Sequence, residues 1–307
     1  MGLFSNDYES AGPGIAKNAP KKKGLALFFD LFFRKIWKLF GLNMLFFIFV
    51  IPLIGILPAA YYIKDPKASL AVIGLLLLIF AVNLGPALAG LSKVMRMFII
   101  ERHTFIGRDF FKGYRDNFKK AAIVGVIDIL ALVSAFAGYN VYPVMAVEYG
   151  KVFYIPLVLT FSVALVVLMM NYYIFLMMTA TDLSLRDLIK NSFALAFVAL
   201  KENIITTVIL GVISALMVVL FLYALPFFTL ALPFIPVAIM WFVVCFNSYP
   251  VIQKYVITPF YESRGELNPE LTDGSDEIEE ETLFEDMGGK EKPIEKRKKG
   301  KGKKHIS

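Results

Sequence analysis

The sequence predicts an all-helical fold, a polytopic transmembrane helical bundle of about six spans. Two observations lead to this class. Of the 307 residues, 58% are apolar and only 19% are charged, whereas about a quarter of the residues of a soluble domain are charged. The chain also contains several uncharged stretches that exceed the roughly 20 residues needed for a helix to cross the hydrocarbon core of a bilayer. An ordinary soluble domain is therefore excluded.

Stretches without Asp, Glu, Lys or Arg mark the predicted spans. The first two are joined by the connector Lys64–Lys67, which is short enough to predict a tight hairpin, and the third is interrupted only by Asp128. The last stretch, 203–253, is more than twice as long as one crossing, and prolines from Pro226 to Pro236 predict a turn near its middle. The six spans are predicted near residues 42–63, 69–92, 121–142, 153–180, 204–226 and 231–252.

The positive charges support this topology independently, because the cytoplasmic loops of membrane proteins carry an excess of Lys and Arg. With six spans, 29 of the 32 Lys and Arg residues lie on one side of the membrane, and only Lys64, Lys67 and Lys151 lie on the other. We therefore expect both termini to be cytoplasmic. The net charge of +7 is explained by this orientation before any charged partner is invoked, and we expect no specific nucleic-acid partner.

Two segments on the basic side are predicted to be amphipathic helices. In residues 24–40, Asp30, Arg34 and Lys38 repeat every four residues on an otherwise apolar, Phe-rich helix. Such a helix is expected to lie on the membrane surface with its cations toward anionic headgroups. In residues 105–120, aromatic and aliphatic residues recur at every fourth position with charged residues between them.

A third amphipathic segment is expected within residues 183–200, and it suggests an internal repeat. Each of the three segments that precede spans one, three and five contains an Asp that is followed by an Asn. The pairs are Asp30 and Asn43, Asp109 and Asn117, and Asp187 and Asn203. One interpretation is three repeated units of a surface helix and a hairpin; the other is that any cytoplasmic entry to a span has this composition.

The two ends of the chain are predicted to be disordered. Residues 1–23 form a basic arm, and residues 262–307 form a tail in which an acidic block precedes a basic block. Neither segment has enough apolar residues to bury a core of its own. We expect the tail to be solvated, although its basic end could alternatively contact anionic lipid, ribosome or RNA.

One region resembles a known family. The run Asn-Leu-Gly-Pro-Ala-Leu-Ala-Gly-Leu at 83–91, followed by the Phe-rich basic run at 108–121, resembles the YesL-like family of bacterial membrane proteins. The resemblance is best over 36–60 and 83–140, and an extra apolar segment at about 61–82 departs from short members of that family. It implies a multi-pass protein of the bacterial cell (inner) membrane. The family has no established biochemical activity, and its members are often encoded beside carbohydrate uptake systems.

The Gly-Pro-Ala motif can be interpreted without the family. Ala81, Gly85 and Ala89 recur at every fourth residue, which allows close helix packing. Pro86 frees a backbone carbonyl that a neighbouring group must satisfy. We therefore predict that Gly85, Pro86 and Ala89 form a helix kink and packing site in preference to a ligand site.

Asp128 is the most prominent polar residue of the predicted spans. A carboxylate at that depth is costly unless it is protonated, paired or hydrated, so it is a candidate functional residue. Asn83, Asn171 and Asn247, in spans two, four and six, are candidate partners. If these four side chains converge, they form an intramembrane polar site of the kind that a transporter uses; otherwise they have packing or interfacial roles.

No enzyme is expected, and no cofactor or metal. His103 and His305 are too few and too far apart for a metal site or a nucleophile relay. Gly107 and Gly113 do not form a phosphate-binding loop. The sequence therefore indicates no catalytic residues.

The sequence favours an accessory or regulatory membrane component without catalysis of its own. The expected partners are the lipid bilayer, a membrane permease complex or a second copy of the chain. The candidate face for a partner or for lipid is the basic side of 105–120, formed by Arg108, Lys112, Arg115 and Lys119. The alternative is a small-solute or ion-coupled carrier that uses Asp128.

Overall fold

The computed structural model describes residues 22–266, 268 and 270, and this part of the chain contains helices and no strand. The α-helices are connected by short turns, with a 3-10 helix before α6 and a π-helix after α10. Their bounds are α1 Gly24–Ile54, α2 Ile56–Tyr62, α3 Pro66–Ile99, α4 Ile106–Asp116, α5 Phe118–Tyr149, the 3-10 helix Lys151–Phe153, α6 Tyr154–Ala180, α7 Leu185–Val198, α8 Leu200–Tyr223, α9 Leu225–Ala231, α10 Pro236–Ile252, the π-helix Gln253–Ile257 and α11 Thr258–Glu262.

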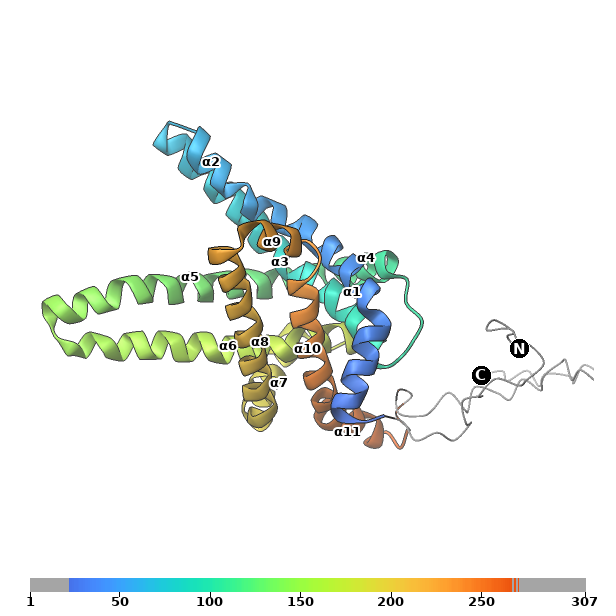
Figure 1. Cartoon of the computed structure of the whole chain (residues 1–307). Helices are drawn as coiled ribbons and strands as arrows, with labels where there is room; N and C mark the ends of the chain where they lie inside the picture. Colours follow the sequence, from blue (N-terminus) through green and yellow to red (C-terminus); the bar gives the residue numbers. More distant parts are fainter. Residues whose placement is uncertain (1–21, 267, 269, 271–307) are drawn as a thin grey trace, which may run out of the picture. The chain divides into compact units, whose positions relative to one another are not determined.

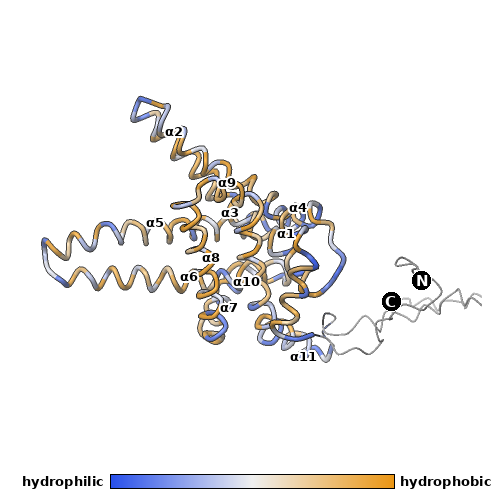
Figure 2. Tube along the Cα trace, viewed as in Figure 1, coloured by the Kyte–Doolittle hydropathy of each residue, from blue (hydrophilic) through white to orange (hydrophobic). Residues whose placement is uncertain are grey.

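Six segments of the described chain are long and apolar enough to cross a membrane, which confirms the predicted fold class. They are Gly24–Tyr62, Pro66–Ile99, Phe118–Tyr149, Lys151–Ala180, Leu200–Tyr223 and Pro236–Glu262. Figure 2 shows that the helix shafts are hydrophobic, whereas hydrophilic residues gather at α4, at the loop before it and at the first two hairpin turns.

Residues 22–260 belong to one compact unit, and Tyr261 begins a second. Within the first unit, the long helices form three hairpins: α1 and α2 with α3, α5 with α6, and α8 with α10. The hairpins diverge, so that α2 and the turn between α5 and α6 lie well apart (Figure 1). The first two hairpins are therefore joined at one end only, whereas the turn of the third hairpin also contacts α1 through Asn43.

The buried core of this unit lies at the joined end. It is formed by the middle of α1, the second halves of α3 and α6, most of α10 and one face each of α4 and α7. Its largest fully buried side chains are Tyr172, Tyr173, Phe98, Phe110, Phe175, Phe242, Leu31, Leu39, Leu42, Leu91, Met95 and Leu176. Because these residues come from both ends of the described chain, the core fixes all three hairpins to one another.

The first helix differs from the prediction of a surface helix at 24–40 followed by a separate span from 42. α1 is continuous from Gly24 to Ile54. At the expected boundary, the residue that disfavours a helix is Gly41. One glycine inside a helix lowers the stability of the helix by only about 1 kcal/mol, which is too little to end it. The predicted second span is likewise unbroken, because Pro86 lies inside α3 without ending it.

The hairpin turns also differ in detail from the predicted boundaries. α5 continues past Pro143 to Tyr149 and ends at Gly150, whose φ of +113° is a conformation that side chains disfavour. The third turn contains the short helix α9, with Pro226 in its first turn, and α10 then begins at Pro236. Proline at the start of a helix is favourable because the N–H that it lacks would have no partner there.

The closest contact between the first two hairpins lies at the crossing of α3 and α5. A Cβ atom at Gly85 would lie 1.8 Å from the carbonyl oxygen of Ala121, and one at Gly125 would lie 2.6 Å from the backbone nitrogen of Gly85. These backbones can approach only because neither position carries a side chain. One turn further along α3, a Cβ at Gly90 would lie 2.7 Å from the carbonyl oxygen of Phe110 on α4.

We predict that Gly85→Ala destabilises the protein by at least about 2 kcal/mol, because the new methyl group meets backbone and forces α3 and α5 apart. Gly74→Ala on the same helix is the matched control, since a Cβ there meets nothing within 4 Å. It should leave stability unchanged or raise it by about 0.5–1 kcal/mol. Thermal unfolding of the purified proteins in mild detergent distinguishes them, and equal midpoints would contradict the assignment.

Candidate functional site

The structure brings one of the three candidate asparagines to Asp128. Asp128 lies on α5, and Asn171 on α6 donates a hydrogen bond from Nδ2 to its Oδ1 at 2.7 Å. The second carboxyl oxygen, Oδ2, is buried and has no hydrogen-bond partner among the described residues. The pair thus connects the two helices of the second hairpin and leaves one acceptor oxygen open.

The other two candidate asparagines form separate hydrogen bonds. Asn83 on α3 accepts a hydrogen bond from the Tyr114 hydroxyl on α4 at 2.5 Å. Burial raises the pKa of the Tyr114 phenol, which keeps the hydroxyl protonated and able to donate. Asn247 on α10 donates to Thr206 Oγ1 on α8 at 3.0 Å. The four predicted polar residues therefore join three different helix pairs, and only Asp128 and Asn171 contact one another directly.

The Asp128 and Asn171 pair has limited chemical capacity. An ionised carboxyl group in apolar surroundings is costly, and a single amide donor satisfies only one of its two oxygens. The open oxygen can hold a proton or accept a hydrogen bond from a solute. Among the described residues, no group of three His, Cys, Asp or Glu side chains could hold a metal ion.

The residues of the predicted kink and packing site lie in the core. Pro86 and Ala89 are buried beside Gly85 on the second half of α3. Ser92, one turn after Leu88, donates to the Leu88 carbonyl at 2.7 Å and accepts a hydrogen bond from Trp241 Nε1 at 2.9 Å. This part of α3 therefore contacts α4, α5 and α10, and its surface is covered by these neighbouring helices.

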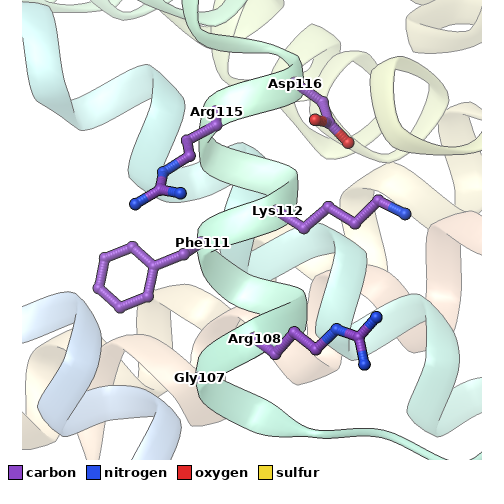
Figure 3. A pocket seen from close by; sticks show the side chains of 6 residues that line it. All are labelled: Gly107, Arg108, Phe111, Lys112, Arg115 and Asp116. Carbon is purple, nitrogen blue, oxygen red and sulfur yellow. The ribbon is translucent and has the colours of Figure 1, made fainter.

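The basic side of α4 lines a surface depression of about 410 Å³. Figure 3 shows its lining on the outer face of the helix, where Arg115 and Phe111 point to one side and Lys112 to the other. Arg108 and Asp116 complete the charged lining, and Lys119 follows in the first turn of α5, exposed. The opposite face of α4 is buried at Phe110.

The charges of α1 are arranged differently from the expectation that they face lipid headgroups. Asp30 pairs with Lys22 and lies 3.7 Å from Arg34. Arg34 in turn forms an ion pair of 2.7 Å with Glu101, in the turn after α3. The outward stripe of this half of α1 is instead apolar, with Phe29, Phe33 and Trp37 exposed.

A buried polar cluster between α6 and α8 was not predicted from the sequence. Tyr173 donates its hydroxyl hydrogen to Asn203 Oδ1 at 2.5 Å, and the Tyr172 hydroxyl lies 2.9 Å from Thr207 Oγ1. Both tyrosines are fully buried, which requires partners for their hydroxyl groups. The signal available in the sequence was the pair of adjacent tyrosines in an otherwise apolar span.

Asn203 has a second role at the break between α7 and α8. Its Nδ2 donates to the carbonyl oxygens of Leu195 at 3.2 Å and Ala196 at 2.9 Å. Asn117 has a similar role at the break between α4 and α5, where its Nδ2 donates to the Gly113 carbonyl at 3.1 Å. These side chains add donors at carbonyl groups near the ends of the interrupted helices, where backbone donors run out. The Leu195 carbonyl also accepts a hydrogen bond from the Ala199 N–H at 3.1 Å.

Asn43 performs the corresponding task for the third hairpin. It is buried on α1, donates to the Leu232 carbonyl at 3.1 Å and accepts a hydrogen bond from the Ala238 N–H at 2.8 Å. These two backbone groups flank the turn between α9 and α10. One amide side chain therefore satisfies both sides of an irregular segment in apolar surroundings.

Comparison with known proteins identifies one family. Residues 39–140, about a third of the chain, match a family described as protein of unknown function, DUF624. The matched segment runs from α1 through α4 to the outer part of α5, and it includes the Gly85 crossing, the basic face of α4 and Asp128. No curated protein and no solved structure matches the chain.

We predict that Asn203→Ala lowers the stability by about 1–3 kcal/mol, because it leaves the Tyr173 hydroxyl and the Ala196 carbonyl without this partner. Asn140→Ala is the matched control. Asn140 is exposed on α5 and donates only to the Phe136 carbonyl of its own helix. Thermal unfolding in detergent should separate the two variants by several degrees, and equal stabilities would contradict the role of Asn203.

Proposed function

We propose that this membrane protein is an accessory or regulatory subunit that binds another membrane protein, has no catalysis of its own and serves an uptake system. The observation that carries the proposal is the divergence of two apolar hairpins, α1 to α3 and α5 to α6, from one packed core (Figure 1). Van der Waals packing between helices stabilises a membrane protein, and a protein without a partner obtains this packing by bringing its own helices together. Here the helix faces between the hairpins are available to a partner.

The second hairpin shows this availability best. Beyond Asp128, α5 and α6 contact each other, and their remaining faces carry large exposed apolar side chains. These are Leu130, Leu132, Val133, Phe136, Tyr139, Val141, Val144 and Val147 on α5 and Ile155, Val158, Leu159, Phe161, Val163 and Leu165 on α6. Lipid can cover such faces, and so can the transmembrane helices of a partner.

The distribution of charge and aromatic residues supports an orientation for this subunit. Exposed tyrosines lie at the hairpin ends, with Tyr61 and Tyr62 on the first, Tyr149 on the second and Tyr223 on the third. Tyrosine favours the boundary between lipid and water. The joined end carries most of the Lys and Arg, so we infer that the core end faces the cytoplasm, together with both termini, and that the tyrosines mark the outer boundary.

The resemblance to the YesL-like family supports the choice of uptake system. The DUF624 match covers much of the region in which that resemblance is found. Members of the YesL-like family are often encoded beside carbohydrate uptake systems, so a permease for carbohydrate in a bacterial inner membrane is the proposed partner.

A specific observation favours one competing function. The buried Oδ2 of Asp128 has no hydrogen-bond partner among the described residues. The proton-binding or solute-binding group of a carrier is in the same state before its proton or solute binds. In this second proposal the protein is a small-solute or ion-coupled carrier. Asn171 would then orient the carboxyl group through its 2.7 Å hydrogen bond.

We predict that the tagged full-length protein, isolated from native membranes in mild detergent, carries a permease or its ATPase in stoichiometric amount. Mass spectrometry identifies the partner, and the size of the complex gives the stoichiometry. A variant with Val133 and Phe136 changed to Ala on the exposed side of α5 should retain less partner, because it removes contact area without touching the core. Recovery of the chain alone or only with its own copies would contradict the accessory role.

For the competing function, we predict that Asp128→Asn abolishes solute flux in reconstituted vesicles while the membrane level of the protein stays normal. The substitution keeps the shape of the side chain and removes its capacity to release a proton. Asn140→Asp, at an exposed position on the same helix, is a control for altered charge. Unchanged flux in Asp128→Asn vesicles would exclude coupling through this carboxyl group.

A further inference from the structure

We propose that the outer face of α4 binds the phosphate headgroup of an anionic phospholipid. This site is distinct from the lateral surfaces that the proposed subunit offers to a partner. It consists of the depression lined by Arg108, Phe111, Lys112 and Arg115 (Figure 3). Its volume of about 410 Å³ accommodates a glycerophosphate group.

The cations of this depression are available to an external anion. Among the residues that the structure describes, no acidic side chain forms an ion pair with Arg108, Lys112 or Arg115. The one acidic group in the lining, Asp116, lies 3.6 Å from Lys93 on α3. Three exposed cations thus line one open surface, with Lys112 and Arg108 on one side of the helix and Arg115 on the other, and no acidic side chain among the described residues is paired with them. Guanidinium groups favour bidentate binding of phosphate.

The contacts between α4 and α3 keep the basic face of α4 pointing outward. Its inner side is fixed to α3, where Phe110 is fully buried and a Cβ at Gly113 would lie 3.0 Å from the Cα atom of Gly90. The Tyr114 hydrogen bond to Asn83 adds a second attachment to α3. The helix therefore cannot rotate its cations inward without losing these contacts.

A lipid headgroup fits this site better than a soluble anion. α4 has 11 residues and lies directly between two helices long enough to span a membrane, so no part of it is more than about 16 Å along the chain from a spanning helix. Phe111 lies in the depression itself, and Phe105, just before α4, is 60% exposed. Cations beside exposed aromatic side chains match the boundary between headgroups and acyl chains.

The test uses the full-length protein in nanodiscs of phosphatidylcholine with or without phosphatidylglycerol, and native mass spectrometry counts retained lipid after release into detergent. We expect preferential retention of phosphatidylglycerol. Each cation removed should weaken this retention about fivefold, so Arg108→Gln, Lys112→Gln and Arg115→Gln combined should abolish it. The control combines Arg186→Gln and Lys190→Gln, which neutralise exposed cations on α7, and should retain the lipid.

Three results would overturn the proposal. Equal losses in the α4 and α7 variants would indicate general electrostatic attraction, and undiminished retention in the α4 variant would place the lipid elsewhere. Equally tight binding of glycerol phosphate in lipid-free detergent would identify a soluble phosphate as the ligand. Thermal unfolding checks that the variants are folded, and Lys112→Gln and Arg115→Gln measured singly, each expected to lose about fivefold, replace the combined variant if it is unstable.

Discussion

Inside a bilayer, every backbone N–H and C=O group must find its hydrogen-bond partner within the protein, and the arrangement of this chain depends on that constraint. Uninterrupted helices meet it by themselves. Interruptions that are buried, in the bilayer or in the core end, require another donor or acceptor, and at three of them an asparagine contributes one: Asn117 at the end of α4, Asn203 at the end of α7 and Asn43 beside the turn before α10. Because Asn43 lies on α1, the turn of the last hairpin is held by the first helix.

The fold class and the number of spanning helices could be predicted from the sequence because the length of an apolar run is a local property. The helix ends were less predictable. α1 continues through the expected boundary near residue 41, and α5 continues past Pro143, because neither a single glycine nor a proline near the outer end stops a helix that has no competing polar environment.

The contacts of the polar residues could not be predicted, because they depend on which helices are neighbours. Asp128, Asn83, Asn171 and Asn247 were grouped because each lies in a predicted span, yet the structure distributes them over three helix pairs. Tyr172 and Tyr173 were missed for the opposite reason. Their rings count as apolar in a span, and only burial shows that their hydroxyl groups need partners.

The charges near the core end divide into two groups with different surroundings. Asp30, Arg34 and Glu101 neutralise one another and fix α1 to the turn after α3. On α4, the acidic residues are engaged elsewhere: Asp109 accepts a hydrogen bond from the Phe105 N–H, and Asp116 lies beside Lys93. The first group stabilises the chain internally, and the cations of the second group remain exposed.

The glycine contact between α3 and α5 has a mechanical consequence. From Gly125 to Tyr149 the helix extends about 36 Å beyond this contact, at 1.5 Å per residue. The second hairpin is thus a stiff lever with its fulcrum in the core, so a rotation of about 10° there displaces its far end by about 6 Å. Conversely, a force applied at the far end of the hairpin produces a larger force at the contact with Gly85 and at the adjoining helix α4.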